Sequence, residues 1–235
     1  MKLIIGLIIL SVIGIFLLNS CKSCGKNGNG HVVMQNRSVS SFNKISVEGV
    51  FPVELSQDGT NEFVKVEADE NLQDYIIVTN EGDKVVVKFT EQGSIYASKK
   101  MKVYINIKKL TELEFKSVGS LTTANTLILD TLELNSESVG KLHLDIEANF
   151  LRANLSSVGA TTLKGKVNEV RINNKSVGTL SAYDLKAGTL MIHNTAIGTA
   201  EIYADSAFYL LHFANSLATQ LFYHTRSFII KCADG

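Results

Sequence analysis

The stretch Asn135–Gly159, NSESVGKLHLDIEANFLRANLSSVG, contains two copies of a Ser-Val-Gly motif that begin 19 residues apart. Other copies, exact or degraded, keep the same rhythm, with successive spacings of 21, 19, 19, 20 and 20 residues. A fixed period near 20 residues with strand-like patterning predicts a solenoid of stacked coils. One coil cannot bury its inner face alone, so neighbouring coils must stack to create the core. The copies are Ser117-Val118-Gly119, Ser138-Val139-Gly140, Ser157-Val158-Gly159, Ser176-Val177-Gly178, Ala196-Ile197-Gly198 and Ser216-Leu217-Ala218.

A pair of apolar residues in alternation with polar ones precedes each copy, and another apolar strand follows it. Alternation with a period of two is typical of a half-buried strand. A coil of about 20 residues has room for two or three short strands and their corners. The sequence therefore predicts an all-β solenoid whose repeats span residues 111–220. The apolar pairs are Leu113 and Phe115, Leu132 and Leu134, Leu151 and Ala153, Val170 and Ile172, Leu190 and Ile192, and Leu211 and Phe213.

The motif itself is expected to form a corner of the coil. Its glycine marks a place where the backbone needs a positive φ or tight curvature. The residue before the glycine is branched and apolar in every copy. We therefore expect that residue to line the interior as one column, with like side chains about 4.8 Å apart. The column comprises Val118, Val139, Val158, Val177, Ile197 and Leu217.

An asparagine recurs three residues before the serine of three copies, as Asn135, Asn154 and Asn173. Stacked in register, these amides can form a ladder in which each side chain bonds its copies above and below. The alternative is a polar stripe that binds a ligand. Both readings place the three side chains in one file.

The amino terminus has the pattern of an export signal. Lys2 is followed by an apolar run over residues 3–18 and then by small polar residues, and this run is short for a membrane span of about 20 residues. Leu18-Asn19-Ser20-Cys21 resembles the lipobox of bacterial lipoproteins. We predict a lipoprotein signal peptide over residues 1–20, a lipidated Cys21, and a flexible tether over residues 21–30. The alternatives are an uncleaved membrane anchor and an ordinary signal peptide.

Residues 31–110 show short alternating runs separated by turn signals, so we predict an N-terminal β part that caps the first coil. Within it, only Asp69–Tyr75 has the pattern of a helical turn. Residues 221–235 are predicted to cap the last coil, which makes residues 31–235 one domain. Cys24 and Cys232 are open to two readings, a disulfide, which an oxidising envelope permits, and unpaired thiols.

Several segments together resemble a known family. A lipobox is followed by FNKISVEGVFPVEL (Phe42–Leu55), VKVEADENL (Val64–Leu72), KVYI (Lys102–Ile105) and the Ser-x-Gly coils. In this order the chain resembles the putative auto-transporter adhesin, head GIN domain family, over roughly residues 35–225. The resemblance implies a right-handed parallel β-helix. It brings no catalytic residues to this chain.

The composition disfavours several classes of function. Lys and Arg total 23, as do Asp and Glu, and this balance argues against nucleic-acid binding. We expect no cofactor and no metal, because the histidines occupy different offsets in their coils. Asp145 and Glu147 lie two apart on one strand and so face the same side. They have no Arg or His at the same offset on the neighbouring coils, so we interpret them as a solvated face and predict no enzyme activity.

The functional hypothesis is a non-catalytic lipoprotein of the cell envelope, held to the outer membrane through lipidated Cys21 and either periplasmic or surface-exposed. It would act as an adhesin, or as a binding or structural module, presenting the β-helix surface to a protein or glycan. Tyr183 and Tyr203, 20 residues apart, are the candidate binding stripe; the alternative is that they only stabilise the ladder. The competing hypotheses are a glycan-active β-helix enzyme and an envelope lipoprotein for assembly or signalling.

Overall fold

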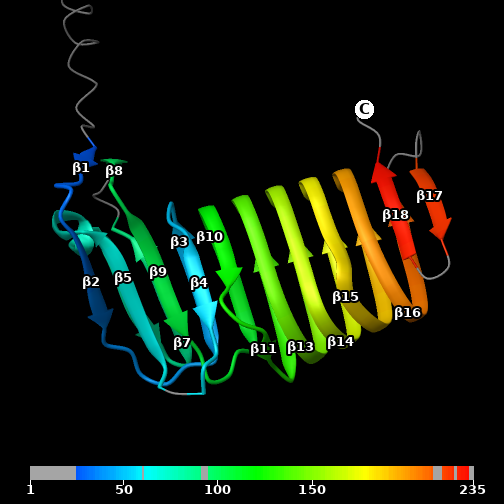
Figure 1. The fold of residues 1–235 in the computed structure, drawn as a ribbon, viewed down its shortest axis with the longest axis horizontal. Helices are drawn as coiled ribbons and strands as arrows, with labels where there is room; N and C mark the ends of the chain where they lie inside the picture. The colour runs from blue at the N-terminus through cyan, green and yellow to red at the C-terminus, as the bar shows by residue number, and fades with distance from the viewer. Residues whose placement is uncertain (1–24, 60, 91–94, 214–218, 225–226, 233–235) are drawn as a thin grey trace, which may run out of the picture.

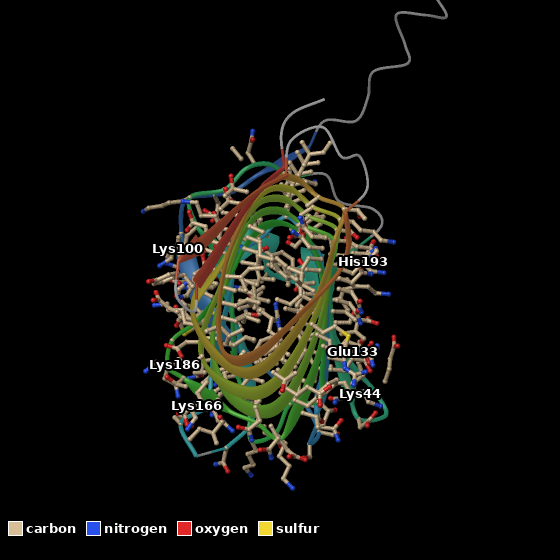
Figure 2. The ribbon with its side chains drawn as sticks, turned by 90° about the vertical axis from the view of Figure 1, so that its right-hand side faces the viewer. Lys44, Lys100, Glu133, Lys166, Lys186 and His193 are labelled. Carbon is tan, nitrogen blue, oxygen red and sulfur yellow. The ribbon has the colours of Figure 1, made fainter. Side chains whose placement is uncertain are left out.

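A computed structural model of the protein describes residues 25–59, 61–90, 95–213, 219–224 and 227–232. Beyond residue 202 it describes only the backbone. Its main body is a solenoid of about five turns, which confirms the predicted fold class. The coils stand side by side in chain order from β10 to β16 (Figure 1). Seen along the stack, each coil is a flattened oval filled with side chains (Figure 2). The repeat strands are β10 (Glu112–Thr123), β12 (Thr131–Ser136), β13 (Val139–Leu155), β14 (Val158–Asn174), β15 (Val177–Asn194) and β16 (Ile197–Phe213).

The coils stack in register because each repeat strand pairs in parallel with the one before it. Val139 pairs with Val158, which pairs with Val177. The long strands β13 to β16 each bend around most of a coil, so one strand supplies residues to both broad sides of the oval. Stacking of identical motif positions is what the 20-residue period predicts.

The core is a set of apolar columns that run the length of the stack. One column is Leu132, Leu151, Val170 and Leu190, and all four side chains are buried. The predicted apolar pairs are buried up to Leu190 and Ile192. The last predicted pair, Leu211 and Phe213, is out of register, because Leu190 and Ile192 lie beside Phe208 and Leu210 instead.

The predicted interior column of branched residues is wrong. Val118, Val139, Val158, Val177 and Ile197 form one continuous file, but their side chains point outward and are 46–55% exposed. Leu217 lies outside the described residues. We call the five described residues the valine ridge.

The serines of the motif take the inward positions. Ser117, Ser138, Ser157 and Ser176 are buried. The Ser157 hydroxyl lies 2.9 Å from that of Ser136 and 3.1 Å from that of Ser138. It also accepts a hydrogen bond from the Ser138 N–H. Because a hydroxyl both donates and accepts, a stack of serines can be buried at the corner without unpaired groups, and the alternation of the strand then turns the valine outward.

The corner glycines are required by the stacking. From Gly140 to Gly198 their φ angles lie between +125° and +141°. A β-carbon on Gly159 would overlap the carbonyl oxygen of Gly140, and the same holds along the column. Any side chain would therefore push two coils apart.

The N-terminal part covers the first coil with a mixture of parallel and antiparallel pairs. β3 and β4 pair in parallel with β10, and β9 pairs in parallel with β4, whereas β5 and β2 continue the sheet in antiparallel order. The predicted helical turn is present as the 3₁₀ helix η1 (Glu70–Tyr75). The strands are β2 (Val32–Arg37), β3 (Lys44–Gly49), β4 (Val53–Ser56), β5 (Phe63–Asp69), β6 (Ile76–Glu81), β7 (Lys84–Phe89) and β9 (Met101–Asn106). The short strand β11 (Leu127–Ile128) follows β10 within the first coil and pairs in parallel with β13.

At the other end, a hairpin of β17 (Thr219–His224) and β18 (Ser227–Cys232) follows the last coil. β18 pairs with β16 in antiparallel order, from Gly198 beside Cys232 to Tyr203 beside Ser227. Cys24 and the signal region lie outside the described residues. Within the described part of the chain, no helix has the length and hydropathy needed to cross a membrane.

Residues 26–30, which the sequence analysis assigns to the tether, contact the domain. β1 (Lys26–Asn27) pairs with β8 (Ile95–Ala97). The buried Asp69 carboxylate accepts hydrogen bonds from the backbone N–H groups of Gly30, at 2.6 Å, and Lys99, at 2.8 Å. The carboxylate thus fastens the entering chain to the N-terminal part of the domain.

Replacing Gly159 with alanine is expected to lower the free energy of unfolding by about 3 kcal/mol or more, since backbone strain and a clash with a fixed carbonyl add together. Gly59→Ala is the matched control, because Gly59 also has a positive φ, +75°, but open space around it; its loss should be about 1–2 kcal/mol. Urea unfolding measures both variants. Equal losses would show that the close approach of coils does not constrain the corner.

The stability of the protein should fall in acid partly through Asp69. Burial raises the pKa of this carboxyl, but the backbone N–H groups of Lys99, Gly30 and Lys100 outweigh it and hold the pKa below the ordinary 3.8. A lowered folded-state pKa stabilises the protein above about pH 4, and this contribution is lost as the pH falls through the folded-state value.

Asp69→Asn should therefore cost about 2 kcal/mol at pH 7 and progressively less below pH 4, as followed by urea unfolding across this range. Glu70→Gln, at an exposed neighbouring position, is the control. A cost for Asp69→Asn that does not change with pH would contradict the assignment.

Candidate functional site

The two broad sides of the solenoid differ in chemistry. Glu133, His193 and Lys44 project from one side, and Lys166 and Lys186 project from the other (Figure 2). On the lysine side, Asp145 lies beside Lys164 and Glu147 beside Lys166 on the next coil. The two acids that the sequence analysis weighed as catalytic are thus interleaved with lysines on an open strand face.

The opposite side, which we call the arginine face, is formed by the outward residues of β12 and of the second halves of β13, β14 and β15. Strand alternation places two files of outward side chains there, each one residue away from a buried column. The outer file is Glu133, Arg152, Arg171 and Met191, and the file beside it is Asn135, Asn154, Asn173 and His193.

A shallow pocket of about 160 Å³ lies on the arginine face. It is centred where the two files run together over three consecutive coils. Its lining residues are Arg152, Asn154, Arg171, Ile172, Asn173, Met191 and His193.

The two guanidinium groups are neighbours, since Arg152 pairs with Arg171 in the ladder. They lie 5.9 Å and 5.4 Å from the centroid of the Phe150 ring, within range of a cation–π interaction. Arg171 also forms an ion pair with Glu169 at 2.7 Å. Among the described residues Arg152 has no ion pair, although Glu133 lies on the adjacent strand. The pocket is therefore bordered by a cation that remains open to an external anion.

The predicted asparagine ladder is formed in part. Asn154 donates to the Asn135 Oδ1 at 2.8 Å, whereas the Oδ1 of Asn173 has no hydrogen-bond partner among the described residues. The sequence analysis missed a second ladder at the opposite corner, in which Asn149 donates to Asp130 and Asn168 donates to Asn149. Its signal was the 19-residue spacing of these three residues, which is the period of the repeat.

The tyrosine stripe stays a prediction. Tyr183 lies on β15 and is 52% exposed, but the side chain of Tyr203 is outside the described residues. The pairing of β15 with β16 also shifts after Ala182. A 20-residue spacing therefore does not by itself align the two rings.

A larger hollow, of about 1,140 Å³, lies at the N-terminal end. Its lining mixes charges of both signs with single apolar groups, and no two like cations are in register there. Within the described part of the chain, no three His, Cys, Asp or Glu side chains are grouped to hold a metal ion. The hollow is lined by Lys26, Glu48, Gly49, Asn71, Asp74, Tyr75, Ile77, Lys88, Phe89 and Thr90.

Sequence reasoning did not find the arginine pair. Arg152 and Arg171 are 19 residues apart, the spacing of the repeat, so the period carried the signal. The predictions of function rested on acids, histidines and tyrosines, whereas this pair is made of cations that the repeat aligns.

Comparison with known proteins agrees with this architecture. A "putative adhesin" from Bacteroides fragilis has a TM-score of 0.70 at 22% identity, covering 74% of this chain and 80% of that one. A "putative lipid binding protein" from Parabacteroides distasonis has a TM-score of 0.58 at 18% identity, covering 80% and 95%. At these identities the likeness shows the fold alone. No curated protein matches the sequence.

The family comparison covers most of the chain. The model of the family described as "putative auto-transporter adhesin, head GIN domain" matches residues 41–209, which span the N-terminal part and the coils up to β16. The resemblance drawn from the sequence segments is thereby confirmed. The chain belongs to the putative auto-transporter adhesin, head GIN domain family.

Proposed function

We propose that the protein is a non-catalytic, adhesin-like module of the cell envelope that binds a carboxylate-bearing glycan on the arginine face. The family description and the "putative adhesin" name of a structural relative support an adhesin-like role and an envelope or surface location. The observation that carries the ligand class is the pair of adjacent arginines beside a file of asparagines.

Each part of this face suits one part of an acidic sugar. A guanidinium presents two parallel N–H donors to a carboxylate. A primary amide both donates and accepts hydrogen bonds, so Asn154 and Asn173 can pair with hydroxyl groups of a sugar. The files continue over several coils at a spacing of about 4.8 Å, so an extended polymer can make repeated contacts where a small anion makes one.

The same arrangement supports binding without turnover. Glycosidases need two carboxyl groups facing the scissile bond, about 5–10 Å apart. The described residues that line the pocket include no carboxyl group. The protein therefore holds its ligand, and its effect comes from many weak contacts along a flat face.

Removing either arginine should weaken glycan binding. We expect Arg152→Ala to weaken binding of polygalacturonate at least about tenfold, because a charge-assisted hydrogen bond contributes about 1.5–3 kcal/mol. Arg171→Ala should have a smaller effect, since Glu169 already pairs with Arg171. Calorimetry with the full chain in detergent measures both.

Lys186→Ala, on the opposite side of the solenoid, is the matched control and should bind as the unmodified protein does. A neutral polymer of comparable length should bind at least tenfold more weakly, as electrostatic recognition requires. Equal affinity for acidic and neutral polymers, or equal losses in Arg152→Ala and Lys186→Ala, would rule out the proposed site.

The chain is proposed to be anchored in the outer membrane through acyl chains on Cys21, in either the periplasmic or the surface orientation. The lipobox pattern Leu18-Asn19-Ser20-Cys21 supports this. Several acyl chains hold a protein stably on a bilayer, at about 0.8 kcal/mol for each buried methylene.

Cys21→Ser should abolish incorporation of a labelled fatty acid and release the protein from the membrane fraction. Cys24→Ser is the matched control and should keep both. Labelling is read by mass spectrometry of the amino-terminal peptide. Acylation retained in Cys21→Ser would place the lipid on another residue, and absence of label from the unmodified protein would exclude lipidation.

A further inference from the structure

The valine ridge is an unbroken apolar file on the outside of the solenoid. Its five residues belong to five consecutive coils. Val50, which is 50% exposed, extends the file by one step, because Gly49 pairs with Ser117 at the same corner. Six residues at about 4.8 Å per step give a length of about 24 Å. Single exposed apolar residues are ordinary on protein surfaces, whereas contiguous apolar patches mark interaction sites.

The neighbouring columns are polar or bare. On one side lie Lys116, Glu137, Ser156 and Lys175, all exposed. On the other side, the corner glycines leave a strip without side chains. Beyond that strip comes a column of Ser120, Lys141, Ala160 and Thr179. The surface thus repeats the same cross-section on each coil, an apolar row next to a glycine strip.

We propose that the valine ridge is a self-association surface on which two copies of the chain lie side by side and parallel. A two-fold axis along the solenoid would seat the valines of each copy on the glycine strip of the other. Because both features repeat with the same spacing, every coil meets its counterpart in the same way. Such an interface is isologous and closes at two copies.

The charges flanking the ridge fit this pairing. The two-fold axis brings the column of Glu137 in one copy against the column of Lys141 in the other, coil by coil. Glu137 and Lys141 lie in the same coil, on either side of Val139. Glu137 of one copy therefore faces Lys141 of the other, and the two-fold symmetry forms this contact twice. The remaining facing pairs are neutral or carry a single charge, and none places like charges together.

The size of the surface predicts a weak dimer. The strip is about 24 Å long, and its three columns of side chains make it about 20 Å wide. It therefore buries about 500 Å² per copy, or about 1,000 Å² in total, which is at the lower limit for specific interfaces. Association would therefore depend on a high local concentration. The parallel arrangement keeps both amino-terminal ends on the same side, as two copies anchored in one membrane require.

A lipid chain is a poorer occupant of the ridge. The hollow beside its first two residues, about 330 Å³, is lined by Glu48, Lys116 and Glu137 as well as by valines. A buried acyl chain would desolvate these charges without pairing them. A second copy supplies Lys141 opposite Glu137.

The test uses the full chain, labelled with donor or acceptor fluorophores at its carboxyl end and reconstituted in phosphatidylcholine vesicles without any glycan. Energy transfer that rises with protein density reports association. Val158→Asp should raise the density for half-maximal transfer at least about tenfold, because a charge buried at the centre of an interface is costly. Ile128→Asp is the matched control, since Ile128 is 69% exposed and lies off the ridge, and it should change nothing.

Charge reversal tests the orientation independently of folding. Glu137→Lys and Lys141→Glu should each weaken association about tenfold through two like-charge contacts, and the double variant should restore it. The proposal is overturned if energy transfer is independent of density, if Val158→Asp and Ile128→Asp behave alike, or if the double variant is as weak as the singles. A loss confined to Val158→Asp with no rescue would assign the ridge to the lipid surface instead. Glycan binding is measured separately, so failure here leaves the arginine face untouched.

Discussion

In each coil from β13 to β16, the corner glycine lies against the carbonyl oxygen of the glycine one coil earlier. The backbone N–H of Val158 donates to the carbonyl oxygen of Ser138, and that of Val177 donates to the carbonyl oxygen of Ser157, both at 2.8 Å. These hydrogen bonds hold the corners at this spacing. No side chain separates the backbones there. The corner therefore sets the register of every other column, because a strand that slipped by one residue would bring a side chain into the strip and exchange the buried and exposed faces.

Both candidate surfaces follow from this register. Each arginine, asparagine or exposed valine is ordinary when it is taken alone. Exposed charged residues contribute little to stability. Fixed alignment turns each into a file in which the same group recurs on successive coils. The repeat that directs folding thus also gives the solenoid an ordered outer surface. A substitution at one outward position in each coil changes that surface without altering the core.

The 20-residue period, the alternation and the positions of glycine were enough to predict the stacked β architecture, the asparagine file and the apolar pairs as far as Leu190 and Ile192. The sequence did not reveal which side of the corner the valines face. Val139 and Ser138 are adjacent, so one must point inward, and hydrophobicity favours the valine. The structure buries the serine because its hydroxyl bonds to Ser136 in the same coil and to Ser157 on the next coil, and the second of these partners is supplied only by stacking. The arginine pair was hidden for a similar reason, since Arg152 and Arg171 become neighbours only through the register.

The closing hairpin has a consequence for how such a chain can change in length. β18 runs antiparallel to β16, so the end of the stack no longer offers a parallel template on which another coil of the same kind could be laid. An unprotected edge of that kind would also invite pairing with foreign strands. Duplication of a repeat could therefore lengthen the protein only by insertion between existing coils, with the first and last elements carried outward unchanged.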